Sequence, residues 1–147
     1  METIHQDFKD FLRLFEEEKV EYLLVGGYAI GNYGYPRATA DMDIWIATNP
    51  VNAEKCAAAI RKFGMDVPEV VPELFLKPNS IIRLGLPPIR IEVHTTLSGV
   101  EFDACFARRH RVSVGGISIN IISLEDLKRN KTSAGRHRDL DDLQHLP

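Results

Sequence analysis

The sequence predicts an α+β fold in which a mixed β-sheet is flanked by helices. Three observations carry this prediction. Residues 3–18 have apolar side chains at helical spacing, as an amphipathic helix does. Residues 41–64 join a strand pattern to a capped helix, and four later segments alternate as strands do. The length of 147 residues fits one domain, so we expect a single domain over 1–147.

The N-terminal elements follow from capping and breaking signals. Thr3 and Gln6 form a capping-box pattern at the start of the first helix. Its expected core side is Ile4, Phe8, Phe11, Leu12 and Phe15. The apolar residues 22–25 predict a buried strand, which Gly26-Gly27 should end in a tight turn. A brief helix is expected at 28–33.

The second strand and the following helix form one unit. Alternation in residues 41–46 predicts a strand. Asn49 is suited to cap a helix that has Pro50 at its first position, and Gly64 is suited to end it. The expected buried face of this helix is Val51, Cys56, Ala59, Ile60 and Phe63.

The remaining chain predicts strands and then a helical tail. The strand segments are 81–84, 89–94, 111–114 and 117–122. Pro-Pro and Gly-Gly turns join them, so the sheet should be mixed. Ser123 opens a short C-terminal helical region at about 123–147, in which Leu140 and Leu143 are expected to continue an apolar face.

The composition is that of a globular protein, with 44% apolar and 27% charged residues. There is no apolar run long enough to span a bilayer and no visible signal peptide, so we expect a cytoplasmic protein without membrane contact. The net charge of −3 argues against a surface that grips nucleic acid as a whole. Cys56 and Cys105 are expected to be buried free thiols.

Two carboxylates share one face of the second strand. Asp41 and Asp43 are two residues apart and should project together, which is unfavourable unless a cation lies between them. Glu92 alternates in the same way on a later strand and is the candidate third acid, with His94 as a wall of the same pocket. Trp45 shares the face of the aspartates, where packing is favoured over stacking on a base. Mg²⁺ or Mn²⁺ would suit such acids, although Asp-x-Asp pairs also cap helices and close turns.

Residues 22–29, followed by 37–44, resemble the signature of the DNA polymerase β superfamily of nucleotidyltransferases. The segment 122–140 is similar to the tail of small bacterial AbiEii-like and related nucleotidyltransferases. The resemblance implies the nucleotidyltransferase fold and a transfer of a nucleoside monophosphate from a nucleoside triphosphate to a hydroxyl acceptor. Pyrophosphate would leave in a two-metal mechanism.

By position, the resemblance implies that Gly26 and Gly27 cradle the triphosphate, while Asp41, Asp43 and Glu92 bind the metals and carry catalysis. Glu92 is also the candidate general base. The family usually has Asp at the third position, so the longer side chain of Glu is a departure. Relatives often carry an additional helical domain for the acceptor. This chain has almost none, which is a second departure.

Four further residues are predicted to bind nucleotide. Lys131 and Arg138 belong with Arg136 to a basic cluster that could meet phosphates, for which a solvated helix face is the alternative. Arg37 and Thr39 precede the first aspartate and could brace that loop or lie at the surface.

Other functions remain open on the sequence alone. A catalytically weakened nucleotide- or partner-binding module, in a toxin–antitoxin system for example, would fit the two departures. An aspartyl phosphotransferase also uses Asp-x-Asp after a strand, and a hydrolase has similar residues. The acceptor could be a small molecule, an RNA end or a protein, and a homodimer could complete the pocket.

Overall fold

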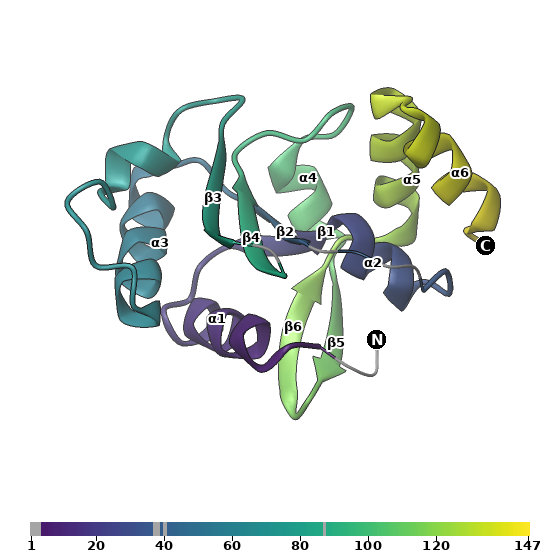
Figure 1. The fold of residues 1–147 in the computed structure, drawn as a ribbon. Helices are drawn as coiled ribbons and strands as arrows, with labels where there is room; N and C mark the ends of the chain where they lie inside the picture. Colours follow the sequence, from purple (N-terminus) through teal and green to yellow (C-terminus); the bar gives the residue numbers. More distant parts are fainter. Residues whose placement is uncertain (1–3, 37–38, 40, 87) are drawn as a thin grey trace.

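The computed structural model describes residues 4–36, 39, 41–86 and 88–147. It confirms the α+β fold, because strands in this part of the chain form one sheet with helices around it (Figure 1). The strands are β1 (Tyr22–Val25), β2 (Asp41–Ile46), β3 (Ile81–Leu86), β4 (Ile89–His94), β5 (His110–Val114) and β6 (Ile117–Ile121). The helices are α1 (Gln6–Glu17), α2 (Gly26–Asn32), α3 (Pro50–Phe63), the 3-10 helix η1 (Pro72–Phe75), α4 (Phe102–Ala107), α5 (Leu124–Ala134) and α6 (His137–His145).

The sheet is mixed, as predicted, and its strand order is β3-β4-β2-β1-β6-β5. β1 runs antiparallel to β2 and parallel to β6, while β2 and β4 are parallel. The antiparallel hairpins β3–β4 and β5–β6 lie at the two edges. Because β2 and β4 are adjacent and run in one direction, side chains at equivalent positions of the two strands lie side by side.

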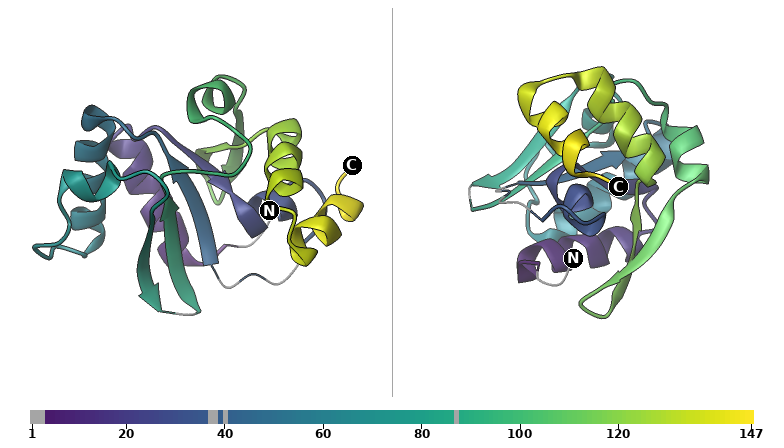
Figure 2. Two further views of the ribbon diagram at one scale, coloured as in Figure 1. Left: turned by 90° about the horizontal axis from the view of Figure 1, so that it is seen from above. Right: turned by 90° about the vertical axis from the view of Figure 1, so that its right-hand side faces the viewer.

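Two pairs of helices lie at opposite ends of the molecule. α1 and α3 pack against each other, whereas α5 and α6 form a pair at the opposite end of the molecule (Figures 1 and 2). The aromatic residues predicted for the core side of α1 are buried. The predicted start of this helix is wrong: it begins at Gln6, and His5 caps it by accepting a hydrogen bond from the Asp7 N–H at 3.0 Å. Thr3 lies outside the described residues.

Helix α3 has the predicted ends, since Asn49 accepts a hydrogen bond from the Asn52 N–H and Gly64 is the left-handed C-cap. The prediction that Val51 is buried is wrong, because 64% of this residue is exposed. Asn52 takes the inward position instead. Its amide donates to the carbonyls of Glu21 and Ala47, and its oxygen accepts from the Glu21 N–H. A buried amide needs such partners, and they fix the helix rotation.

Two further predictions need correction. Gly26-Gly27 does not form a separate tight turn, because α2 begins at Gly26 directly after β1. Leu140 does not continue an apolar face, since 48% of it is exposed while Asp139 and Asp142 are buried on α6. The reason lies in ion pairs with α5, described below.

Both cysteines are buried free thiols, as expected. Burial raises the pKa of Cys56 to about 12 and, as the largest cause, that of Cys105 to about 11. Among the helices of the described residues, none combines the length and the apolar character that a membrane span requires.

Candidate functional site

The site lies on one face of the β2–β4 pair. The register places Asp41 beside Arg90, Asp43 beside Glu92 and Trp45 beside His94. Side chains alternate along a strand, so these six residues share one face. The intervening Met42, Ile44, Ile91 and Val93 are buried in the core on the other face. The predicted parity of both strands is therefore confirmed.

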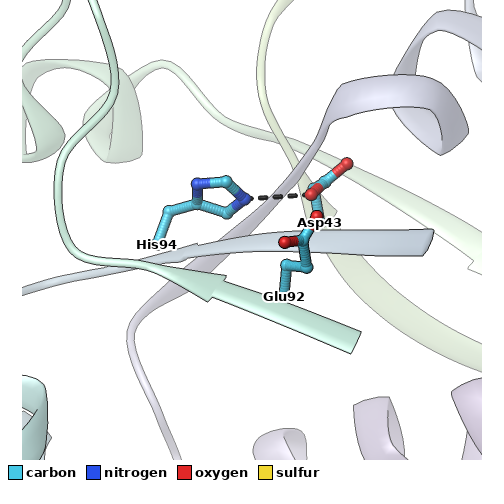
Figure 3. Close-up of side chains that lie close together, drawn as sticks. All are labelled: Asp43, Glu92 and His94. Atoms are coloured by element: carbon cyan, nitrogen blue, oxygen red, sulfur yellow. Dashed lines mark hydrogen bonds and ion pairs between the residues drawn. The ribbon is translucent and has the colours of Figure 1, made fainter. Parts of the chain in front are cut away.

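Asp43, Glu92 and His94 form a group of possible metal ligands (Figure 3). One ligand atom from each lies within 4.8 Å of the others. His94 Nε2 lies 2.9 Å from Asp43 Oδ1, and Arg83 Nε lies 2.8 Å from Glu92 Oε2. Two carboxylates and one imidazole are donors that divalent cations accept. The sequence indicated His94 only as a wall of the pocket.

Asp41 lies next to this group but has a different partner. Arg90 Nε and Nη2 donate to its two carboxylate oxygens at 3.0 and 2.8 Å. The hydrogen bond from Arg90 lowers the pKa of Asp41, and the burial of the carboxylate opposes this only in part. A bidentate pair of this kind fixes the orientation of the carboxylate. Asp41 is thus held ionised, with both oxygens engaged.

The two glycines at the start of α2 allow close approach of other residues. Gly26 has φ +67°, and a Cβ there would lie 2.4 Å from Asp43 Oδ2. A Cβ on Gly27 would lie 2.7 Å from Thr39 Oγ1. Thr39 Oγ1 in turn donates to the Asp41 carbonyl at 3.2 Å. Among the residues that the structure describes, no side chain caps the first turn of α2. Glycine is needed at both positions, because the Asp43 carboxylate and the Thr39 side chain occupy the space that a Cβ would take.

The basic cluster of Lys131, Arg136 and Arg138 is only partly a solvated helix face, because Lys131 is buried. The Lys131 ammonium is buried and lies 3.0 Å from Asp139 Oδ1 and 3.1 Å from Asp142 Oδ2. Arg136 Nε lies 2.7 Å from Asp139 Oδ2. Burial alone would raise the pKa of Asp139, but the hydrogen bonds from Arg136 and Lys131 lower it to about 2. These ion pairs explain why α6 turns acids inward, toward α5.

One cleft of about 630 Å³ brings most predicted site residues together. It is lined by Val25, Gly26, Gly27, Thr39, Asp41, Asp43, Ile81, Arg83, Glu92, His94, Thr96, Leu97, Ser98, Asn130, Lys131, Ala134, Arg136 and Arg138. Residues far apart in the sequence, from β1 to α6, thus face the same space. The predicted nucleotide-binding residue Arg37 lies outside the described residues.

No protein-family model matches this sequence, and no curated protein matches it either. Solved structures do match. A candidate nucleotidyltransferase from Thermotoga maritima gives a TM-score of 0.65 at 16% identity, over 97% of this chain and 94% of that chain. The lincosamide antibiotic adenylyltransferase LnuA, with lincomycin bound, gives a TM-score of 0.59 at 16% identity, over 99% of this chain and 98% of that chain.

These two likenesses extend over almost the full length of each protein. The likeness therefore concerns the fold as a whole rather than one motif. The narrower resemblance to AbiEii-like proteins stays a prediction. The chain has the nucleotidyltransferase fold, as the glycine pair before Asp-x-Asp predicts.

Proposed function

We propose that the protein transfers a nucleoside monophosphate from a nucleoside triphosphate to a hydroxyl acceptor, with release of pyrophosphate. The observation that carries the proposal is the single cleft in which Asp43, Glu92 and His94 face the start of α2 and the arginines of the C-terminal segment. Phosphoryl-transfer chemistry requires acidic side chains that hold a cation and positively charged side chains that bind phosphate.

The residues of the cleft suit a bound triphosphate. Gly26 and Gly27 line the cleft, and the N–H groups at the start of α2 can donate to phosphate oxygens. Arg138 is exposed and lines the cleft, so it can pair with the same oxygens. Lys131 is predicted to bind nucleotide as well, but its buried pairs with two aspartates indicate that it also fixes α6 against α5.

The donor set fits a divalent cation, Mg²⁺ or Mn²⁺, held by Asp43, Glu92 and His94, with Asp41 beside them. A cation bound there would lower the pKa of the acceptor hydroxyl and neutralise charge on the leaving phosphates. Glu92 is the proposed general base, because its carboxylate lies in the cleft and can accept the hydroxyl proton. Arg83 lies against Glu92 and orients that carboxylate.

The proposed acceptor is a small molecule. LnuA is an adenylyltransferase with lincomycin bound, and the present chain covers 98% of its length. A fold of this kind can therefore serve a small-molecule acceptor.

A second candidate function is nucleotide binding without catalysis, as in the binding module considered for a toxin–antitoxin system. The specific observation in its favour is the Arg90 guanidinium, which engages both oxygens of Asp41. A second cation at Asp41 would have to compete with this pair. If it cannot, the cleft would hold a nucleotide and leave it unchanged.

Calorimetric titration of ATP, GTP, CTP and UTP tests the proposal, with Mg²⁺, with Mn²⁺ and without either cation. The wild type should bind at least one triphosphate in a cation-dependent way, and Asp43→Asn should lose this binding. Asp66→Asn, an exposed site outside the cleft, is the control. Binding that ignores both cation and substitution would refute the proposal. Cation-dependent binding without pyrophosphate release across a library of hydroxyl compounds would establish the second candidate.

A further inference from the structure

A second cavity of about 320 Å³ adjoins the cleft, and we refer to it as the side cavity. It lies where β2 ends and α4 begins, and Thr96 and Leu97 line both the cleft and the side cavity. Its apolar walls include Trp45 and Phe102. A cavity of this size is at the lower end of those that hold small molecules.

Trp45 connects the side cavity to the reacting groups. It follows Asp43 by two residues on the same face of β2, which corresponds to a spacing of roughly 7 Å along the strand. His94, the register neighbour of Trp45, lines the cleft and contacts Asp43. The face that carries the possible metal ligands therefore continues into the side cavity.

The Trp45 indole carries a buried polar group. Only 2% of the residue is exposed, and its ring packs edge-on against Phe102, with centroids 5.1 Å apart. Its Nε1–H has no hydrogen-bond acceptor among the described residues. An unsatisfied buried donor costs about 1–3 kcal/mol, so such groups call for an explanation. Because the indole nitrogen is itself enclosed, a ligand of the side cavity would contact the Trp45 ring and not this donor.

The charged residues of the two cavities differ. The cleft has basic residues beside its acids, among them Arg83, Arg136 and Arg138, and these suit a triphosphate. Glu101 and Asp103 line the side cavity, and both are exposed at its wall. Neither acid has an ion pair with another described residue. A ligand of the side cavity should thus combine a positive charge with an apolar body.

We propose that the side cavity binds the acceptor, and that the acceptor is a small amine that carries a hydroxyl group. Its ammonium faces Glu101 and Asp103, its apolar part lies on Trp45 and Phe102, and its hydroxyl points toward Glu92. The inference rests on the proposed function. In the reaction, the hydroxyl oxygen bonds to the α-phosphorus while the bond from this phosphorus to the bridging oxygen breaks. Pyrophosphate leaves with that electron pair, and the hydroxyl proton passes to Glu92.

Intrinsic fluorescence tests the proposal directly, because Trp45 is the single tryptophan of the chain. Leucinol and phenylalaninol serve as probes, and their N-acetyl derivatives serve as controls that keep the hydroxyl but lack the charge. Both amines should change the indole emission in a saturable way, and the acetylated compounds should bind roughly tenfold more weakly. No response to either amine, or equal binding of the uncharged forms, would overturn the proposal.

Two double variants locate the bound amine. Glu101→Gln with Asp103→Asn should weaken amine binding roughly tenfold and leave triphosphate binding unchanged. Glu54→Gln with Asp66→Asn changes the net charge equally at exposed sites outside both cavities and should bind the amines as the wild type does. Equal weakening in both double variants would also overturn the proposal.

The failure of this inference and the failure of the proposed function give different results. If triphosphate binds and the amines do not, the acceptor assignment alone is wrong. If the amines bind and triphosphate does not, the side cavity is an amine site and the transferase proposal is wrong. Release of pyrophosphate only when triphosphate and amine are both present would support the two together.

Discussion

Replacing Gly26 with alanine should weaken cation binding at the site. The added Cβ would lie 2.4 Å from Asp43 Oδ2, whereas real Cβ atoms essentially never approach closer than 3.0 Å. The carboxylate must therefore retreat by at least 0.6 Å, the difference between 3.0 and 2.4 Å. Metal–ligand distances tolerate only about 0.2 Å, so the displaced oxygen no longer fits the ligand set.

Two effects of Gly26→Ala can be separated by magnitude. The left-handed φ of +67° costs an alanine roughly 1–2 kcal/mol of stability wherever it occurs. Gly116→Ala is the matched control, since Gly116 has φ +86° and open space within 4 Å. Both variants should lose about this amount of stability. Only Gly26→Ala should also weaken cation binding, by roughly 10–100-fold.

Calorimetric titration of Mn²⁺ measures the affinity, and urea denaturation measures the stability of each variant. If Gly26→Ala binds Mn²⁺ as the wild type does and loses only as much stability as Gly116→Ala, Asp43 is not a ligand in the described position. That result would refute the geometric reasoning even if the variant were inactive.

Three further predictions concern named side chains. His94→Asp should shift the preference of the site from Mn²⁺ toward Mg²⁺, because an oxygen replaces the imidazole nitrogen. Competition calorimetry measures the ratio of the two affinities, and an unchanged ratio would exclude His94 as a ligand. Lys131→Met should cost about 3–5 kcal/mol in urea denaturation, since it removes a buried cation that two buried carboxylates share, and a loss below about 1 kcal/mol would contradict this. Asp139 and Asp126 have folded pKa values lowered from 3.8 to about 2, through ion pairs that outweigh their burial. Above pH 4, each should contribute about 2 kcal/mol to the free energy of unfolding, and this contribution is lost as the pH falls toward 2. Acid titration of Asp126→Asn should therefore show a shallower loss of stability than the wild type shows.

The sequence predicts most strongly those elements whose signals are local. Asn49, Pro50 and Gly64 mark both ends of α3, since each acts on its own helix terminus. The alternation of β2 and β4 separates Asp43 and Glu92 from the core residues between them, because the strand period of two leaves no other arrangement. Fold class and the face of the carboxylates therefore follow from short segments.

What the sequence does not predict depends on partners that are distant along the chain. The contact of His94 with Asp43 requires the register of two strands that are 51 residues apart. The inward acids of α6 look like a solvated face until Lys131 of α5 is placed beside them. The glycine pair is a turn signal in the sequence, yet Asp43 and Thr39 are what exclude a side chain there.

The basic partners of the acids also predict the order in which cations bind. Arg83 opposite Glu92 has 57% of its side chain exposed, so displacing it costs little. Arg90 holds Asp41 by two hydrogen bonds and is 32% exposed, so this pair is harder to open.

A first cation should therefore bind at Asp43, Glu92 and His94, and a second should reach Asp41 only when phosphate oxygens of a nucleotide add to its ligands. Paramagnetic resonance should count about one bound Mn²⁺ per chain alone and about two with a non-hydrolysable triphosphate. Arg90→Met should admit the second ion without nucleotide. Two tightly bound ions in the wild-type protein without nucleotide would show that the Arg90 pair does not control the site.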